Sequence, residues 1–221
     1  MNTISFPKIT PASDRAILVQ FGKSISENAH RQVFSFTQSL IDHPLENIIN
    51  IHPGYSSVMV SLEMTASLSS VTEYLQDVLS KVIDIDYPKP RIVEVPITYG
   101  GENGPDLKRV AHHAGLTPDE VIKHHSEGSY LVYFLGFSIG FPYLGGMDES
   151  IATPRLDNPR KSVPKGSIGI AGDQTGIYPL SSPGGWNIIG KTTLPIFNIE
   201  NPEQSALKMG DRVKFILVEG V

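Results

Sequence analysis

The chain has 221 residues, a length between one and two domains, and we expect two. Its formal net charge is −5 and it has no run of basic residues, which argues against nucleic acid or an anionic membrane surface as the principal partner. The absence of cysteine excludes disulfides and thiolate chemistry. Residues 1–12 lack the apolar core of a signal peptide, and no apolar stretch approaches about 18 residues, so we expect a soluble, cytoplasmic protein.

Residues 1–88 predict a small α+β domain, in which one sheet is covered by two helices. The first helix is expected to begin near Ser24 and Glu27, which have capping-box spacing ahead of an apolar stripe. Ser70 and Glu73 repeat this spacing ahead of a second amphipathic stripe. The expected order is strand, helix, strand, strand, helix, over residues 15–22, 24–43, 47–52, 55–62 and 70–82.

A polar segment with two prolines, residues 84–90, indicates a domain boundary, so that the second domain covers residues 89–221. After an initial strand, two short helices are expected at the periphery, and Thr117 and Glu120 have capping-box spacing at the second of them. The rest alternates β-rich runs with Gly and Pro clusters, which is typical of a closed or nearly closed β-barrel. The expected strands cover residues 91–98, 130–137, 167–172, 176–180, 186–192 and 212–219.

Residues 185–192 match the phosphate-binding pattern G-x-x-x-x-G-K-[ST]. That pattern binds phosphate where a strand enters the loop and a helix leaves it. Pro195 lies four residues past Lys191 and opposes such a helix, and Trp186 is bulky where the phosphate cradle needs an unobstructed backbone. We therefore interpret the segment as a tight Pro-Gly-Gly turn that leads into a strand.

Residues 136–140 match the nucleophile-elbow pattern G-x-S-x-G around Ser138. In the hydrolase fold that carries this motif the histidine follows the serine, whereas the last histidine of this chain is His125. No helical pattern follows the segment either. We interpret it as a glycine-rich turn of the barrel rather than as a serine hydrolase site.

Two pairs of adjacent histidines, His112 with His113 and His124 with His125, lie on the two short predicted helices. Adjacent residues on a helix point about 100° apart, and no i, i+4 pair with a nearby acid occurs, so solvated helix surface is favoured over a metal site. His125 is a special case, because it ends a helix directly before the strand that enters the glycine-rich region. An imidazole there can face a pocket as an acid or base; the alternative is a surface or capping histidine.

The region 155–191 is positively charged within an acidic chain. Arg155 and Arg160 each follow a proline, which fixes a fork-shaped cation on stiff backbone and favours binding of a carboxylate or phosphate. The alternative is a solvated rim, or pairing with acids elsewhere. Further candidates are Lys165 and Lys191 as anion-binding groups, and four aromatic residues that form either apolar walls or barrel core, Phe141, Tyr143, Tyr178 and Trp186.

Three segments form a long signature: GFSIGFPYLGG (136–146), TPRLDNPRKSVPKGSIGIAGDQTGIYPLSSPGGWNIIGKT (153–192) and GDRV (210–213). Together they resemble the KipI family, also called the allophanate hydrolase subunit 1 family, which includes the B subunit of bacterial 5-oxoprolinase. The likeness extends through ITYGGENGPDL (97–107) and more weakly through HPGYSSVMV (52–60), so it covers nearly the whole chain.

The resemblance implies a small α+β domain followed by a cyclophilin-like β-barrel. It also implies ATP-dependent opening of 5-oxo-L-proline to L-glutamate by a complex with the A and C subunits, with ATP as co-substrate, no metal on this chain and no activity of the chain alone. His125 is then the expected catalytic group. The expected substrate- and anion-binding residues are Arg155, Arg160, Lys165, Lys191, Gln174, Phe141, Tyr143, Tyr178 and Trp186.

The family name implies an alternative, a regulatory module that binds and inhibits a sensor histidine kinase. Prolyl isomerase activity is a third idea that rests on the barrel fold alone. Relatives usually have proline at the position of Ile139, alanine at that of Lys165 and arginine at that of Lys191. The exchange at Lys191 accounts for the apparent phosphate-binding pattern.

Overall fold

The computed structural model describes residues 6–82, 87–136 and 138–218. The expected boundary at 84–90 therefore lies partly outside the described residues. Residue 137 of the G-x-S-x-G segment and residue 219, the last of the expected final strand, lie outside them as well. Contacts within the chain divide it into two compact units, residues 1–89 and 90–221. Among the described residues, no helix is both long enough and apolar enough to cross a membrane.

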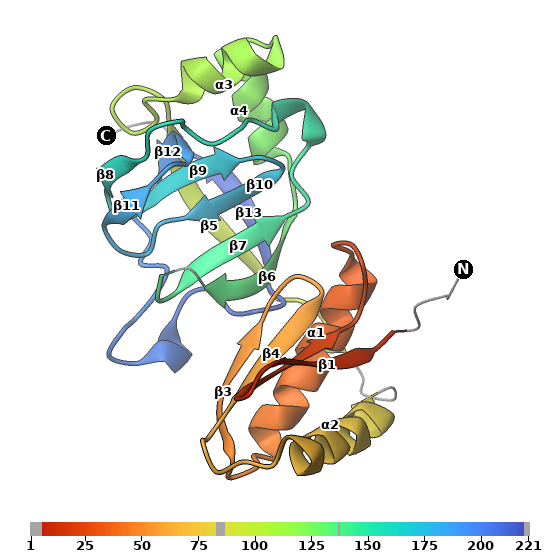
Figure 1. Cartoon of the computed structure of the whole chain (residues 1–221). Coiled ribbons are helices and arrows are strands. Elements are labelled where there is room, and N and C mark those ends of the chain that lie inside the picture. The colour runs from red at the N-terminus through yellow and green to blue at the C-terminus, as the bar shows by residue number, and fades with distance from the viewer. Residues whose placement is uncertain (1–5, 83–86, 137, 219–221) are drawn as a thin grey trace. The chain divides into compact units, whose positions relative to one another are not determined.

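The described part of the first unit contains a four-stranded antiparallel sheet with the order β1-β2-β4-β3 (Figure 1). Its strands are β1 (Lys8–Ser13), β2 (Ala16–Gln20), β3 (Ile48–Pro53) and β4 (Ser57–Leu62). The expected corner at Pro53-Gly54 is confirmed, because it joins β3 to β4. A 2.8 Å hydrogen bond from the Gly54 N–H to the Ser57 carbonyl closes it.

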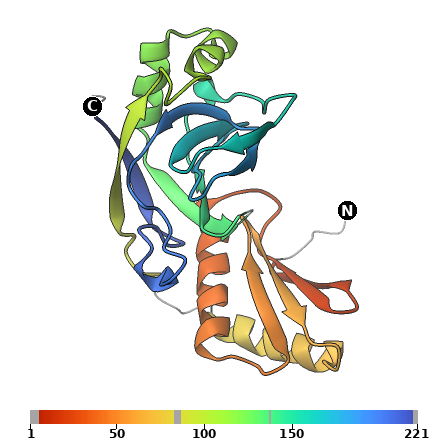
Figure 2. The ribbon, with the colours of Figure 1, turned by 90° about the vertical axis from the view of Figure 1, so that its left-hand side faces the viewer.

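Two helices, α1 (Glu27–Asp42) and α2 (Leu68–Val82), pack against each other, and α1 also contacts β3 and β4 (Figure 2). Val33 and Phe36 of α1 are fully buried, as are Val58 and Val60 of β4. A helical stripe of period 3.6 thus meets the alternate residues of a strand, which is the layer packing that the apolar pattern predicts.

Some details of the first unit differ from the sequence-based expectation. Strand β1 was not expected, because its proline and its few apolar residues weaken the strand pattern; it forms at the sheet edge, where Pro11 is tolerated. The predicted helix caps were wrong by two and three residues. Ser26, not Ser24, caps α1, and Ser67, not Ser70, provides the hydroxyl at the start of α2.

Over its described residues, the second unit is a closed barrel of seven strands in the order β10-β7-β6-β13-β5-β12-β9, closed by pairing of β9 with β10 (Figure 1). The predicted barrel is confirmed. Neighbouring strands are antiparallel except for β5 and β13, which are parallel. The strands are β5 (Ile92–Tyr99), β6 (Tyr130–Gly136), β7 (Phe141–Gly145), β9 (Ser167–Ala171), β10 (Gln174–Ile177), β12 (Asn187–Lys191) and β13 (Arg212–Leu217).

Helices α3 (Leu107–Ala114) and α4 (Pro118–Ser126) pack on each other at one end of the barrel (Figures 1 and 2). The predicted capping box of α4 is confirmed, since Thr117 and Glu120 bond reciprocally. Both helices are peripheral as expected, since they lie outside the strands, but each buries one face against the barrel. Val110 and Val121 are fully buried in the main core of the unit, because an open barrel end needs an apolar cover.

The segment between β5 and α3 lies directly on strand β12. The Gly100 N–H donates to the Ile189 carbonyl at 3.0 Å, and the Asp106 N–H donates to the Ile188 carbonyl at 2.9 Å. Glycine is required at Gly104, because a Cβ atom there would lie 2.0 Å from the Ile189 carbonyl oxygen. This close approach fixes the start of α3 relative to β12.

Strand β7 was missed in the sequence because Pro142 and Gly145 stand within it and suggest a turn. A separate two-stranded sheet of β8 (Arg160–Val163) with β11 (Ser182–Gly184) was also missed, because polar residues, proline and glycine dominate these two strands. Residues 138–140 form the turn between β6 and β7, two antiparallel strands, so a strand-to-helix elbow is absent there as expected. Lys191 ends strand β12 and residues 192–200 contain no helix, which confirms that the phosphate-binding pattern lacks its structural context.

Replacing Gly104 with alanine is expected to destabilise the second unit by about 1–3 kcal/mol, because the backbone must shift to admit the methyl group. Urea unfolding followed by the fluorescence of Trp186, the single tryptophan, reports on this unit. Gly185→Ala is the control, since Gly185 lies in the same unit and a Cβ there has its nearest neighbour at an ordinary 3.5 Å. Equal midpoints for the two variants would show that the close approach is not a constraint.

Candidate functional site on the outer face of the barrel

Strands β7, β10, β9 and β12 present an outer face with a floor of small residues. Side chains alternate along each strand, and Thr175 of β10 is fully buried inside, so Gly176 faces outward. A Cβ atom at Gly176 would lie 2.7 Å from the Phe141 ring, and one at Gly169 would lie 3.1 Å from the Cβ of Trp186. The missing side chains make room for rings on the outside of the barrel.

Four residues fill this room and are named here the aromatic layer: Phe141, Tyr143, Tyr178 and Trp186. The Phe141 ring is central, with centroid distances of 5.2 Å to Tyr143, 5.2 Å to Tyr178 and 5.3 Å to Trp186, all near edge-to-face. Phe141 and Tyr178 are 1% exposed and Trp186 is 6% exposed, while Tyr143 is half-buried. The layer is thus a packed cluster outside the barrel interior, and Tyr143 is its member that reaches solvent.

Arg155 lies above the edge of this layer. Its guanidinium carbon is 6.0 Å from the centroid of the Trp186 ring, within cation–π range, and the residue is exposed. Its guanidinium has no hydrogen bond or ion pair to any of the described residues. Arg155 therefore keeps its hydrogen-bonding capacity for an anion.

Arg160 contacts the backbone of the same tryptophan, but its guanidinium is already paired with a carboxylate. One of its terminal nitrogens donates to the Asp106 carboxylate at 2.7 Å, and the other donates to the Trp186 carbonyl at 3.4 Å. The side chains of Arg160 and Asp106 are 30% and 10% exposed. The structure thus brings both predicted arginines to Trp186 but gives them different environments.

Both tyrosines of the layer are hydrogen-bond donors at neutral pH. Burial raises the pKa of Tyr143, and the nearby Arg155 opposes this only in part. Burial also raises the pKa of Tyr178, against the opposing effects of a hydrogen bond from the Trp186 backbone and of both arginines. A protonated, half-exposed Tyr143 beside Arg155 suits recognition of a carboxylate or phosphate oxygen.

The two predicted lysines lie at the other end of strand β12. Lys191 ends the strand, about 13 Å from the Asn187 end at the usual rise per residue. Lys165 precedes Gly166, whose carbonyl accepts the Thr192 N–H at 2.9 Å, so it lies at the same end as Lys191. Gln174 begins β10 two residues from Gly176 and therefore shares the outer face, where it is half-buried.

His125 lies in the interior of the unit, and the expectation of a surface or capping histidine was wrong. It is fully buried and stacks on Phe215 with a centroid distance of 4.6 Å. The Thr175 hydroxyl donates to a backbone carbonyl and accepts from Nε2 at 3.0 Å, which leaves Nδ1 to accept from the Tyr99 hydroxyl at 2.7 Å. Both ring nitrogens are occupied within the core.

The other histidines of the two helices lie at the surface as expected. His112 and His113 are exposed, and His124 bonds to Asp148 at 2.7 Å with both side chains partly exposed. Within the described ranges, no three His, Cys, Asp or Glu side chains converge on one point that could hold a metal ion.

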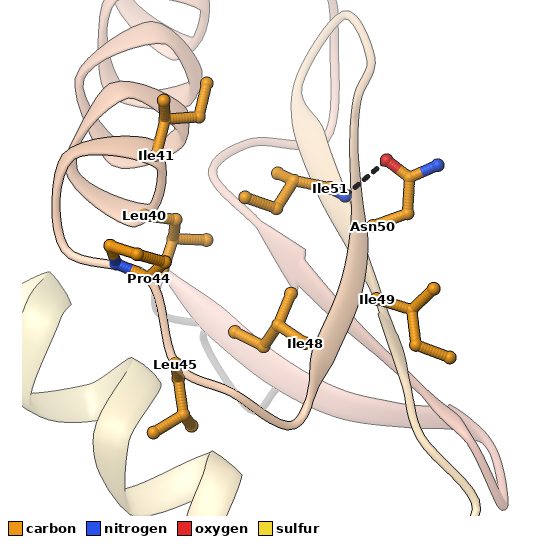
Figure 3. Close-up of a pocket in the computed structure, with 8 residues that line it drawn as sticks. All are labelled: Leu40, Ile41, Pro44, Leu45, Ile48, Ile49, Asn50 and Ile51. Atoms are coloured by element: carbon orange, nitrogen blue, oxygen red, sulfur yellow. Dashed lines mark hydrogen bonds between the residues drawn. The ribbon is translucent and has the colours of Figure 1, made fainter.

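The first unit has an apolar groove between the end of α1 and strand β3 (Figure 3). Its volume is about 270 Å³. The lining residues are Leu40, Ile41, Pro44, Leu45, Ile48, Ile49, Asn50 and Ile51, with Asn50 the polar member. Because this lining contains no titratable group, the groove offers no acid–base chemistry.

Three residues that position the site were missed in the sequence. Asp106 pairs with Arg160, and Arg109 donates to the side chain of Asn187 and to the carbonyl of Pro154. Asn187 also donates to the Pro154 carbonyl at 2.9 Å, so it ties the loop that carries Arg155 to strand β12. Asp106 was hidden because an aspartate before a helix is already explained as a cap.

Comparison with known proteins defines the class of this chain. Residues 7–207 match a family model described as the carboxyltransferase domain, subdomain C and D. A Bacillus subtilis protein named as the B subunit of 5-oxoprolinase is 40% identical over 96% of this chain and 92% of its own length. Haemophilus influenzae has a protein of the same name that is 39% identical over 96% and 98%. The chain belongs to the carboxyltransferase C and D subdomain family, among the proteins named as 5-oxoprolinase B subunits, which confirms the resemblance.

Solved structures share the fold of this chain. The TTHA0988 structure is 32% identical with a TM-score of 0.81, and the match covers 94% of this chain but 40% of the TTHA0988 chain. A conserved uncharacterized protein, PH0987 from Pyrococcus horikoshii, is 45% identical over 96% and 98% of the two chains, with a TM-score of 0.57. Urea carboxylase from Kluyveromyces lactis shares the fold, at 20% identity and a TM-score of 0.75 over 23% of its length.

Acid is expected to destabilise the second unit through His125. Burial lowers the pKa of His125 from 6.5 to about 3, so between these values the unfolded chain binds a proton that the folded chain does not. The stabilisation is complete above pH 6.5 and is lost as the pH falls toward 3, by an amount on the order of a few kcal/mol. The urea midpoint of the wild type should fall more steeply below pH 6.5 than that of His125→Gln.

The exposed His112→Gln is the matched control and should follow the wild type. Identical pH dependence of His125→Gln and the wild type would contradict a neutral, buried imidazole.

The two arginines are expected to differ in their effect on stability. Arg160→Gln removes a partly buried charge-assisted pair and should lower the free energy of unfolding by about 2 kcal/mol. Arg155→Gln should change it by less than about 0.5 kcal/mol, as should Lys161→Gln, an exposed neighbour. Urea titration followed at Trp186 measures all three; a larger loss for Arg155→Gln than for Arg160→Gln would reverse the assignment.

Proposed function

We propose that this chain is the B subunit of an ATP-dependent 5-oxoprolinase that opens 5-oxo-L-proline to L-glutamate together with the A and C subunits. The observation that carries the proposal is 39–40% identity to three proteins named as the B subunit of 5-oxoprolinase, over at least 92% of either sequence. A name that contains "subunit" supports an assembly with partner chains rather than activity of the chain alone.

The chemistry explains the need for ATP. The lactam is a stable amide, so its carbonyl carbon must be activated before water attacks. Transfer of the γ-phosphoryl group to the lactam oxygen releases ADP and provides this activation. Water then adds to the carbon, the C–N bond breaks as the nitrogen takes a proton, and a second water hydrolyses the resulting acyl phosphate to glutamate and phosphate.

In this proposal Arg155 binds the carboxylate of 5-oxo-L-proline or a phosphoryl oxygen, and Tyr143 donates a hydrogen bond beside it. The guanidinium is exposed, has no hydrogen bond or ion pair to the described residues, and lies over the ring of Trp186. A fork-shaped donor next to an apolar surface suits a small ring that bears one carboxylate.

His125 has a structural role in the proposal rather than a catalytic one. It is fully buried, and both of its ring nitrogens are bonded to Tyr99 and Thr175, so the imidazole is not available for proton exchange with a substrate on the outer face. We assign the proton transfers of ring opening to a partner subunit.

The test is 5-oxo-L-proline-dependent release of ADP and glutamate by the purified chain, by the mixture with the A and C subunits, and by mixtures that omit each protein in turn. Turnover is expected in the full mixture alone. Turnover that persists without this chain would contradict the proposal.

Absence of turnover in every mixture of folded proteins would also contradict it. That result would favour the alternative role, inhibition of a sensor histidine kinase, which autophosphorylation assays with and without the chain measure directly.

A further inference from the structure

Asp106 stands at the N-cap of helix α3 but does not cap it. Aspartate at this position normally accepts a hydrogen bond from the first turn, which is worth about 1 kcal/mol. Here the Asp106 side chain makes no such bond. Its carboxylate is directed instead toward strand β12 and the loop that carries the arginines.

Each carboxylate oxygen of Asp106 has a separate partner. One accepts from Arg160 at 2.7 Å, and the other accepts from the Ile188 N–H at 2.6 Å. The Asp106 N–H also donates to the Ile188 carbonyl at 2.9 Å, so both the side chain and the backbone of Asp106 are hydrogen-bonded to Ile188 of β12. With 10% of the side chain exposed, these bonds are shielded from water and correspondingly strong.

Arg160 connects Asp106 to the aromatic layer through a hydrogen bond to Trp186. Its second terminal nitrogen donates to the Trp186 carbonyl at 3.4 Å, two residues before Ile188. The Leu156 N–H donates to the Gly185 carbonyl at 2.7 Å, which holds the start of the same loop beside the tryptophan. The order of contacts is therefore Asp106, Arg160, Trp186 and then Arg155, whose guanidinium lies over the Trp186 ring.

We propose that Asp106 is a positioning residue for anion binding: it neutralises and fixes Arg160, Arg160 fixes Trp186, and Arg155 is left as the cation that receives the substrate's carboxylate. This role rests on the function proposed above. Without Asp106, the Arg160 guanidinium would be released to compete with Arg155 for the same anion, and the Trp186 backbone would lose an anchor.

The test is a double-mutant cycle of Asp106→Asn, Arg160→Gln and the double variant, with the exposed Asp157→Asn as the matched control. Asparagine keeps an oxygen for the Ile188 N–H but removes the charge that holds Arg160. In the full mixture with the A and C subunits, each single variant is expected to raise KM for 5-oxo-L-proline about tenfold with a smaller change in kcat. The double variant should be no worse than Arg160→Gln, because both changes break one chain of contacts.

Trp186, the single tryptophan, provides a second readout on the isolated chain. Asp106→Asn and Arg160→Gln should each shift its emission to the red and raise quenching by neutral acrylamide about twofold, again without additivity. Arg155→Gln should leave the emission in place and selectively reduce quenching by iodide, an anion. Arg160→Gln breaks the same pair from its other end, so the readout remains even where Asp106→Asn gives no folded protein.

The outcomes separate the two proposals. The positioning role would be overturned if the effects of Asp106→Asn and Arg160→Gln on KM were additive, or if neither variant changed the Trp186 emission. The proposed function would stand in that case, provided that the wild-type full mixture is active. Inactivity of the wild-type mixture would overturn the proposed function, and the quenching cycle would still decide whether Asp106 acts through Arg160.

Discussion

The hydrogen bonds between the segment 100–106 and strand β12 hold the functional parts of the second unit in one arrangement. They attach the start of helix α3 to the strand that leads from Trp186 into the barrel. Gly104 permits the close approach, and Asp106 adds the carboxylate bond to Ile188. Because the same carboxylate holds Arg160, the geometry of the outer face depends on this contact.

The two arginines show how local structure divides residues that look equivalent in the sequence. Both follow proline, and both lie at Trp186. The charge of the partly buried Arg160 guanidinium is already balanced by the Asp106 carboxylate. If Arg160 left this pair to bind another anion, the Asp106 carboxylate would remain buried without a counter-charge, which is costly. An exposed and unpaired guanidinium binds a new anion without that cost. The pairing of Arg160 therefore makes Arg155 the better candidate for recognition.

The architecture was largely predictable because it follows from local patterns. The barrel, the two amphipathic helices of the first unit and the α4 capping box at Thr117 all follow from period, turn residues and caps. Strand β7 was missed because glycine and proline, which suggest a turn, stand within and beside it. Parallel pairing of β5 with β13 joins residues that are far apart in the chain, and no local pattern reports it.

The site was predictable in its residue types but not in its geometry. Sequence identified Arg155, Arg160 and the aromatic residues, yet grouped them with Lys165 and Lys191, which the structure places at the opposite end of β12. The burial of His125 was also hidden, since a histidine at the end of a polar helix gives no sign that the helix end closes a barrel. Partners and burial depend on tertiary contacts, which composition and spacing do not contain.

A structure of the proposed complex of this chain with the A and C subunits, with 5-oxo-L-proline added, tests the central claim most directly. The account predicts the substrate carboxylate about 3 Å from the Arg155 guanidinium, near Trp186 and Tyr143, with Arg160 still paired to Asp106. A carboxylate held entirely by groups of the partner proteins, with Arg155 in solvent, would contradict it.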